Sequence, residues 1–256
     1  MELKEKVVEQ GADAKIKRPL VSLVMPYFNP GDNLRGTVEE ALSVLSSIGV
    51  PFEVIAVCDG STDGSESALD GIKDERLKLV KRSKNQGKGF AIRDGFSVGK
   101  GEFVGFMDAD GDIDPKVIPK YLELLEANSS DVVLGSKCHP NSVVDYPALR
   151  RLYSYLYQRL VQALFHLDVK DTQVGIKFIR KSLFDQIAPL MREERFVFDL
   201  ELLVALRSLK DDVIVTEAPV WIRRRFSSTI DVRAVVTIVF DTLSLYGRFR
   251  VGKYRI

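Results

Sequence analysis

The chain has 256 residues, of which 45% are hydrophobic, which is enough for one large domain. Its formal net charge is +1, so we expect no nucleic-acid partner, and its two cysteines form no CxxC pair, so we expect no disulfide framework and a cytoplasmic location. Residues 1–18 have no apolar core and are predicted to be a lead segment rather than a signal peptide. No stretch approaches the roughly 18 consecutive apolar residues that a membrane-spanning helix requires.

Strand and helix patterns alternate through the first 137 residues. Apolar or alternating runs predict strands at 21–28, 52–61, 77–83, 102–112 and 130–137, and apolar residues at helical spacing predict helices at 33–48, 64–72, 88–98 and 115–127. This alternation predicts an α/β fold whose central sheet is mostly parallel and is flanked by helices. Ligands of such sheets bind beyond the carboxyl ends of the strands, where the acidic segments 59–63 and 108–114 are expected to lie.

The second half of the chain has longer helices and a basic end. It is predicted to contain a helix at 146–167, a glycine-containing loop and a strand at 171–180, a helix at 198–209 and a strand at 212–225 that becomes strongly basic. The last predicted helix, at 231–246, is amphipathic, and we assign residues 231–256 to a separate basic C-terminal segment. This helix could rest in the headgroup layer of a membrane, or it could pack on the sheet as an ordinary helix.

Acidic residues after the third apolar strand suggest a metal site. Asp108, Asp110 and Asp112 occupy alternate positions of DADGD, and alternate residues of an extended segment point to the same side. Carboxylates that gather in this way repel one another unless a cation lies among them, and a small set of oxygen ligands suits Mg²⁺ or Mn²⁺ together with substrate phosphates. The sequence therefore predicts either a divalent metal that holds a diphosphate or a solvated acidic turn.

Two further segments at predicted strand ends have polar side chains that suit a nucleotide. Asp59, in CDGSTDGS, could accept a hydrogen bond from a nucleobase N–H, or this segment could simply cap the next helix. The segment NQGKGFAIRDG (85–95) places Lys88 between two glycines, as in a phosphate-binding loop, but it has neither the Walker A spacing nor the GxGxxG spacing. A dinucleotide-binding fold is therefore not predicted.

Five segments together resemble glycosyltransferase family 2, whose members have the GT-A fold. They are, in chain order, VSLVMPYFN (21–29), DGSTD (59–63), NQGKGFAIRDG (85–95), DADGD (108–112) and GSK (135–137). Within the family the chain looks most like the dolichyl- or polyprenyl-phosphate glucose or mannose synthases, because DTQVGIKFIRK (171–181) and RFVFDLELL (195–203) are similar to segments of the glucosyltransferases. The resemblance implies a GT-A catalytic domain over residues 19–230.

The resemblance also implies an activity. It implies that a hexose is transferred, with inversion, from UDP-glucose or GDP-mannose to a polyprenyl phosphate. The protein would act at the cytoplasmic face of the membrane, through peripheral contact with that membrane or with a membrane partner. Because a phosphate acceptor is already anionic near neutral pH, the protein would mainly position the reactants and stabilise charge.

Individual residues receive roles from the same resemblance. The residues expected to bind the donor are Pro26, Tyr27, Asn29, Asp59, Lys88, Asp108, Ala109 and Arg225. The residues expected to bind the Mg²⁺ or Mn²⁺ cofactor are Asp108, Asp110 and Asp112. The residues expected to contact the acceptor phosphate are Lys137, Arg150, Arg151 and Ser154. The catalytic residues are expected to be Asp110, Lys137, Arg151 and Asp199, of which Asp199 is expected to contact sugar hydroxyls.

Several positions depart from the family pattern. Phe28 and Pro30 replace the usual Tyr and Glu, Cys58 replaces an acid, and Lys137 replaces an Arg that could bind phosphate through two parallel hydrogen bonds. The first three changes leave the nucleobase open between uracil and guanine. Two alternatives are also open: a soluble family 2 glycosyltransferase with a sugar or small-molecule acceptor, and a non-catalytic nucleotide-binding module.

Overall fold

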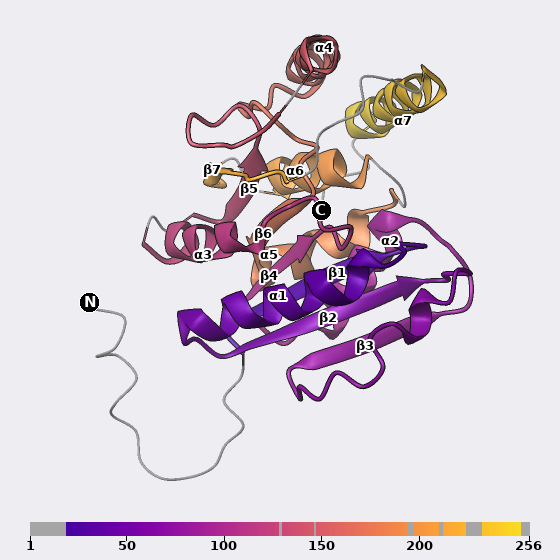
Figure 1. Ribbon diagram of the computed structural model, residues 1–256. Coiled ribbons are helices and arrows are strands. Elements are labelled where there is room, and N and C mark those ends of the chain that lie inside the picture. The colour runs from indigo at the N-terminus through magenta and orange to yellow at the C-terminus, as the bar shows by residue number, and fades with distance from the viewer. Residues whose placement is uncertain are drawn as a thin grey trace.

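Seven strands form one central sheet within the residues that the structure describes. The computed structural model describes residues 19–127, 130–145, 147–193, 197–209, 212–223 and 232–251. The strands lie in the order β3-β2-β1-β4-β6-β5-β7 (Figure 1). β6 is antiparallel to its neighbours β4 and β5, and the other pairs are parallel, which confirms the predicted α/β fold. The bounds are β1 Val21–Tyr27, β2 Phe52–Asp59, β3 Leu77–Arg82, β4 Phe103–Met107, β5 Val132–Ser136, β6 Ile176–Arg180 and β7 Val215–Pro219.

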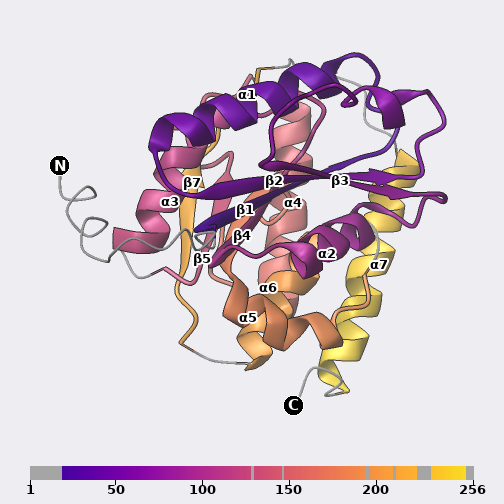
Figure 2. The ribbon, with the colours of Figure 1, turned by 90° about the horizontal axis from the view of Figure 1, so that it is seen from below.

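Helices cover both faces of the sheet (Figure 2). Side chains of α1 (Asn33–Ile48) and α3 (Ile118–Ala127) belong to one buried hydrophobic cluster, and those of α2 (Lys88–Val98), α5 (Lys181–Ile187) and α6 (Phe198–Leu209) belong to a second. β1 is buried along its whole length, because a parallel strand in the middle of such a sheet has apolar neighbours on both faces. The sheet is therefore held between two helical layers.

One predicted helix is largely absent, and α5 is a helix that the sequence pattern does not predict. The segment 64–72 contains only a short 3₁₀ helix, η2 (Ser65–Ser67), and the φ angles of Gly64 and Gly71 are 85° and 86°. These angles lie in the left-handed region, which glycine adopts readily and which interrupts a longer helix. Two other 3₁₀ helices, η3 (Pro115–Val117) and η4 (Ala188–Leu190), precede α3 and follow α5.

Two long helices, α4 (Ala148–Phe165) and α7 (Val232–Arg250), pack against each other on the side of the molecule far from β3 (Figure 1). The hydroxyl groups of Tyr157 and Thr242 lie 3.1 Å apart, and the Phe165 ring contacts two aromatic rings of α7. The last predicted helix is thus present and continues beyond its predicted end. None of the described helices combines the length and the hydrophobicity that a membrane-spanning segment needs.

Candidate active site

The loops after β1, β2 and β3 are tied together by Asn29 and Asp59. Asn29, which has a φ of 48°, accepts a hydrogen bond from the backbone N–H of Thr62 at 2.8 Å. The two carboxylate oxygens of the buried Asp59 accept from the backbone N–H groups of Gln86, at 2.9 Å, and Gly87, at 2.7 Å. Asp59 therefore fixes the loop that leads into α2, in addition to any contact it makes with a nucleotide.

The first residue of α2 lies beside the acidic end of β4. The ammonium group of Lys88 lies 2.5 Å from Oδ1 of Asp108, the residue that follows β4. Burial favours the neutral form of Lys88, but the negative charges of Asp108 and Asp199 outweigh it and raise the pKa of the ammonium. The structure thus brings two predicted donor residues, Lys88 and Asp108, into one ion pair.

The DADGD segment forms a turn instead of continuing β4. Gly111 has a φ of 82°, and the backbone N–H of Asp112 donates to Oδ1 of Asp110 at 3.0 Å. Among the described residues, no group of three His, Cys, Asp or Glu side chains is arranged to hold a metal ion. The turn departs from the extended backbone on which the grouping of Asp108, Asp110 and Asp112 rests, because side chains two residues apart share a side only where the chain is extended.

Asp108 and Asp110 by themselves still fit a divalent metal. Mg²⁺ commonly takes one or two protein carboxylates and completes its shell with water and substrate phosphates. Burial and the negative charge of Asp110 both raise the pKa of the Asp108 carboxyl, against the opposing effect of Lys88. A cation bound to both carboxylates would relieve that repulsion. The donor set therefore suits the expected Mg²⁺ or Mn²⁺ as a two-carboxylate site.

A second ion pair shares an aromatic neighbour with the first. Lys177, on β6, has a side chain that is 1% exposed, and its ammonium donates to Oδ1 of Asp199 at 2.5 Å and to the carbonyl of Val174 at 2.8 Å. The ammonium groups of Lys177 and Lys88 each lie 5.4 Å from the centre of the Phe106 ring. Burial lowers the pKa of Lys177, against the opposing effect of Asp199. Asp199, the predicted sugar contact, is therefore engaged in a buried ion pair.

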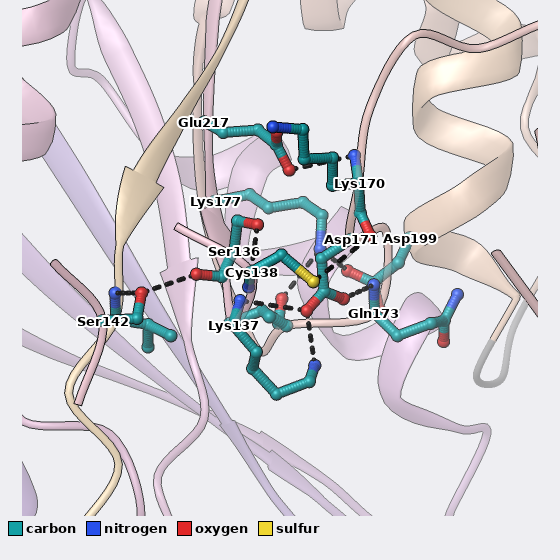
Figure 3. Close-up of polar contacts among 12 residues, drawn as sticks. Ser136, Lys137, Cys138, Ser142, Lys170, Asp171, Gln173, Lys177, Asp199 and Glu217 are labelled. Atoms are coloured by element: carbon teal, nitrogen blue, oxygen red, sulfur yellow. Dashed lines mark hydrogen bonds and ion pairs between the residues drawn. The ribbon is translucent and has the colours of Figure 1, made fainter. Parts of the chain in front are cut away.

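Lys137, which follows β5, is bound to an aspartate of the loop 171–175 (Figure 3). Its ammonium lies 2.7 Å from Oδ2 of Asp171, and its backbone N–H donates to the same oxygen at 3.1 Å. Oδ1 of Asp171 accepts from the backbone N–H of Gln173 at 3.2 Å, which closes a turn within the loop. The predicted acceptor-phosphate residue is thus tied to a carboxylate that the sequence motifs do not single out.

The same loop contacts Asp108 at its other end. The backbone N–H of Asp108 donates to the carbonyl of Gly175 at 2.9 Å, and a Cβ atom at Gly175 would lie 1.9 Å from Oδ2 of Asp108. Sequence reasoning does not identify Asp171, Gly175 or Lys177 as site residues. All three lie in DTQVGIK, and the resemblance of this segment to the family is the feature of the sequence that points to them.

Arg223, in the predicted basic strand 212–225, pairs with acidic residues, and the remaining predicted site residues form three sets. Arg223 forms ion pairs with Glu40, at 2.5 Å, and Asp114, at 2.9 Å, so it links the end of the basic strand to α1 and to the start of η3. The predicted donor residues Pro26, Tyr27 and Ala109 are buried. The predicted acceptor residues Arg150, Arg151 and Ser154 lie near the start of α4. The predicted donor residue Arg225 lies outside the described residues.

A seven-stranded, mostly parallel sheet between two layers of helices is the α/β architecture of the GT-A fold. The structure of glucosyl-3-phosphoglycerate synthase from Mycobacterium tuberculosis in complex with Mn²⁺, UDP and phosphoglyceric acid has the same fold, with a TM-score of 0.69 and 20% identity over 90% of this chain and 79% of that chain. The sequence model of glycosyl transferase family 2 matches residues 22–188, and the chain belongs to this family. The predicted family and fold are confirmed.

Two named relatives are dolichyl-phosphate beta-glucosyltransferases. The protein from Saccharomyces cerevisiae is 28% identical over 221 residues, which cover 78% of this chain and 66% of that protein. The protein from Homo sapiens is 28% identical over 253 residues, which cover 92% of this chain and 78% of that protein. The match therefore spans about two thirds of the yeast relative's length and a larger share of the human one.

Proposed function

We propose that this protein transfers glucose from UDP-glucose to dolichyl phosphate or another polyprenyl phosphate, with inversion at the anomeric carbon. The observation that carries the proposal is that Asp108 and Asp110 follow β4 while Lys137 follows β5. Only β6 separates these two strands, so they lie about 10 Å apart at the usual strand spacing. That separation can place one sugar ring between a bound diphosphate and an incoming phosphate.

The choice of donor rests on the relatives. Two of them are named as glucosyltransferases, which favours glucose over mannose, and the similar solved structure was determined with UDP, which favours uracil over guanine. Asn29 and Asp59 would form the nucleotide side of the site through the loops that they hold together. Lys88 would lie next to the diphosphate, because it already pairs with Asp108.

The reaction would be a single displacement. An oxygen of the acceptor phosphate attacks C1 of the sugar, and the bond between C1 and the diphosphate oxygen breaks as UDP leaves. Asp108 and Asp110 would hold the Mg²⁺ or Mn²⁺, whose charge stabilises the leaving diphosphate. Lys137 would hold the attacking phosphate, with Arg150, Arg151 and Ser154 as further acceptor contacts. The acceptor is already ionised, so the proposal needs no general base.

An exposed apolar surface on α4 and α7 supports a lipid-linked acceptor. The residues of the α4–α7 surface recur at helical spacing, and the exposed fractions of their side chains range from 44% to 70%. α4 contains three arginines and no acidic residue. Apolar side chains with cations beside them suit the headgroup layer of an anionic membrane, so we place the protein peripherally at a cytoplasmic membrane face. The surface comprises Leu149, Leu152, Tyr153 and Leu156 on α4, and Val236, Phe240 and Leu243 on α7.

The Asp110→Asn variant is expected to lower glucosyl transfer by about 10²–10³-fold, because an amide cannot supply the charge that holds the metal and the leaving diphosphate. Asparagine keeps an oxygen that can accept from the N–H of Asp112, so the turn is expected to persist. The assay measures transfer of labelled glucose to polyprenyl phosphate with Mn²⁺, with and without a chelator. Asp185→Asn, in an exposed ion pair on α5, is the matched control and is expected to retain activity. Full transfer by the Asp110→Asn variant in the presence of chelator would exclude the proposed metal role.

Donor and acceptor identity are tested in the same assay. UDP-glucose and GDP-mannose are compared as donors, and polyprenyl phosphate is compared with 3-phosphoglycerate, which stands for a small soluble acceptor. We expect a lipid-linked product with UDP-glucose. Product from 3-phosphoglycerate alone would support the soluble alternative, and nucleotide binding without any transfer would support the non-catalytic module.

The double variant Leu152→Glu with Leu156→Glu is expected to reduce binding to vesicles of phosphatidylcholine and phosphatidylglycerol by at least about ten-fold, because it puts two charges into the apolar stripe of α4. Flotation measures the bound fraction. Val98→Glu, at a side chain that is 43% exposed at the end of α2, is the control and should float like the unaltered protein. Transfer to a short, water-soluble prenyl phosphate should be unchanged in the double variant. Equal flotation of all three proteins would contradict the role of the α4–α7 surface.

A further inference from the structure

The contact between Asp171 and Lys137 is more specific than a surface ion pair. One oxygen of Asp171 receives both the ammonium and the backbone N–H of Lys137, at 2.7 and 3.1 Å (Figure 3). The Lys137 side chain is 14% exposed, and the Asp171 side chain is 9% exposed. The other oxygen of Asp171 is used by the N–H of Gln173. The carboxylate therefore fixes its own loop and the side chain of Lys137 at the same time.

We propose that Asp171 is the positioning residue of the acceptor-phosphate site, and that it holds the Lys137 ammonium where the phosphate arrives. This inference rests on the proposed function, because it takes a phosphate as the ligand of Lys137. A lysine side chain is flexible and loses considerable rotamer freedom when it is ordered. Asp171 removes most of that freedom before the acceptor binds. An ammonium has three donors, so it can bridge a carboxylate and a phosphate.

The negative charge of Asp171 has a cost for acceptor binding. A carboxylate near an anionic phosphate repels it, so Asp171 should weaken the affinity for the acceptor while it improves the orientation of Lys137. A residue that served only to stabilise the loop would not separate these two effects. The inference therefore predicts that removal of the charge lowers kcat without weakening the affinity for the acceptor.

The position of Asp171 also connects the two halves of the site. Its loop ends at Gly175, whose carbonyl accepts from the N–H of Asp108 at 2.9 Å. Between them, the carbonyl of Val174 accepts from Lys177 at 2.8 Å. One short loop thus holds the acceptor cation at one end and a proposed metal ligand at the other, which keeps the two at a fixed separation.

The Asp171→Asn variant tests the inference. An amide has a single acceptor oxygen, so it can serve either the turn or Lys137, but not both. We expect kcat for transfer to polyprenyl phosphate to fall about ten-fold, while the acceptor KM stays the same or decreases and the affinity for UDP with Mn²⁺ is unchanged. The Asp171→Glu variant, which keeps the charge, should recover part of kcat. An unchanged kcat, or equal losses of kcat, UDP affinity and thermal stability, would overturn the inference.

A double variant and a chemical probe provide independent readouts. If Asp171 acts through Lys137, adding Asp171→Asn to Lys137→Met should cause little further loss of kcat, whereas additive losses count against the inference. The rate at which a water-soluble acetylating ester modifies Lys137 should rise in the Asp171→Asn protein, with Lys120 as the internal control. Unchanged labelling of Lys137 overturns the inference whatever the acceptor is. If the labelling of Lys137 depends on Asp171 but the protein transfers glucose to no phosphate acceptor, the proposed function is overturned. The phosphate role of Lys137 is then overturned with it.

Discussion

The Gly175→Ala variant is expected to fold and to lose about 10²-fold in kcat/KM. The added Cβ would lie 1.9 Å from Oδ2 and 2.4 Å from Cγ of Asp108, so the whole carboxyl group must move. The backbone of Gly175 has no positive φ, so alanine is not strained there by its own conformation. The expected damage is therefore confined to the position of a proposed metal ligand, and a displacement of about 1 Å in an active site can cost this much activity.

The measurements are glucosyl transfer and the affinity for UDP in the presence of Mn²⁺, together with the thermal midpoint. Gly36→Ala is the matched control, because a Cβ at this position in α1 meets no atom within 4 Å. It should leave activity unchanged and stabilise the helix slightly. Full activity of the Gly175→Ala protein would show that the position of the Asp108 carboxyl group is unimportant for the reaction.

The Lys177→Met variant is expected to have the largest effect on stability, a loss of about 3–5 kcal/mol. Lys177 is 1% exposed and Asp199 is 6% exposed in their side chains, so the change leaves a carboxylate buried without its cation. It also removes the donor to the Val174 carbonyl. The urea midpoint should therefore fall markedly, and the loop that carries Asp171 should lose one of its anchors.

Two further variants separate the loss of the ion pair from a general effect of removing lysine. Lys120→Met breaks an exposed pair with Glu123 and should leave the urea midpoint nearly unchanged. The double variant Lys177→Met with Asp199→Leu replaces the pair by apolar side chains and should recover most of the lost stability. If the double variant is less stable than Lys177→Met alone, the unpaired charge of Asp199 is not the cause of the loss.

Much of the donor side could be predicted because its residues lie close to strand ends that are visible in the sequence. The apolar run of β4 predicts where Asp108 and Asp110 leave the sheet, and the glycines around Lys88 predict a loop that begins a helix. The turn at Gly111 that separates Asp112 from an extended segment could not be predicted, because it depends on backbone conformation rather than on residue spacing.

The acceptor side was less predictable, because its contacts join distant parts of the chain. The family resemblance identifies Lys137 as an acceptor residue. Its partner Asp171 comes after α4 in the chain, so the two residues are far apart in the sequence. Asp199, in FDLELL, was predicted to contact sugar hydroxyls. Only packing shows that Lys177 reaches it from β6. Arg223, in the predicted basic strand 212–225, pairs with Glu40 and Asp114, which are distant from it in the sequence.

By itself the sequence determined the α/β class, most strand and helix positions, the family and the acidic strand ends of this protein. Those features depend on local periodicity and on short motifs, which are readable within a few residues. The tertiary structure decided the antiparallel place of β6, the loop that joins Asp171 to Gly175, and the pairing of α4 with α7. Strand direction and ion pairing depend on which distant segments become neighbours, and hydrophobic periodicity carries no information about that choice.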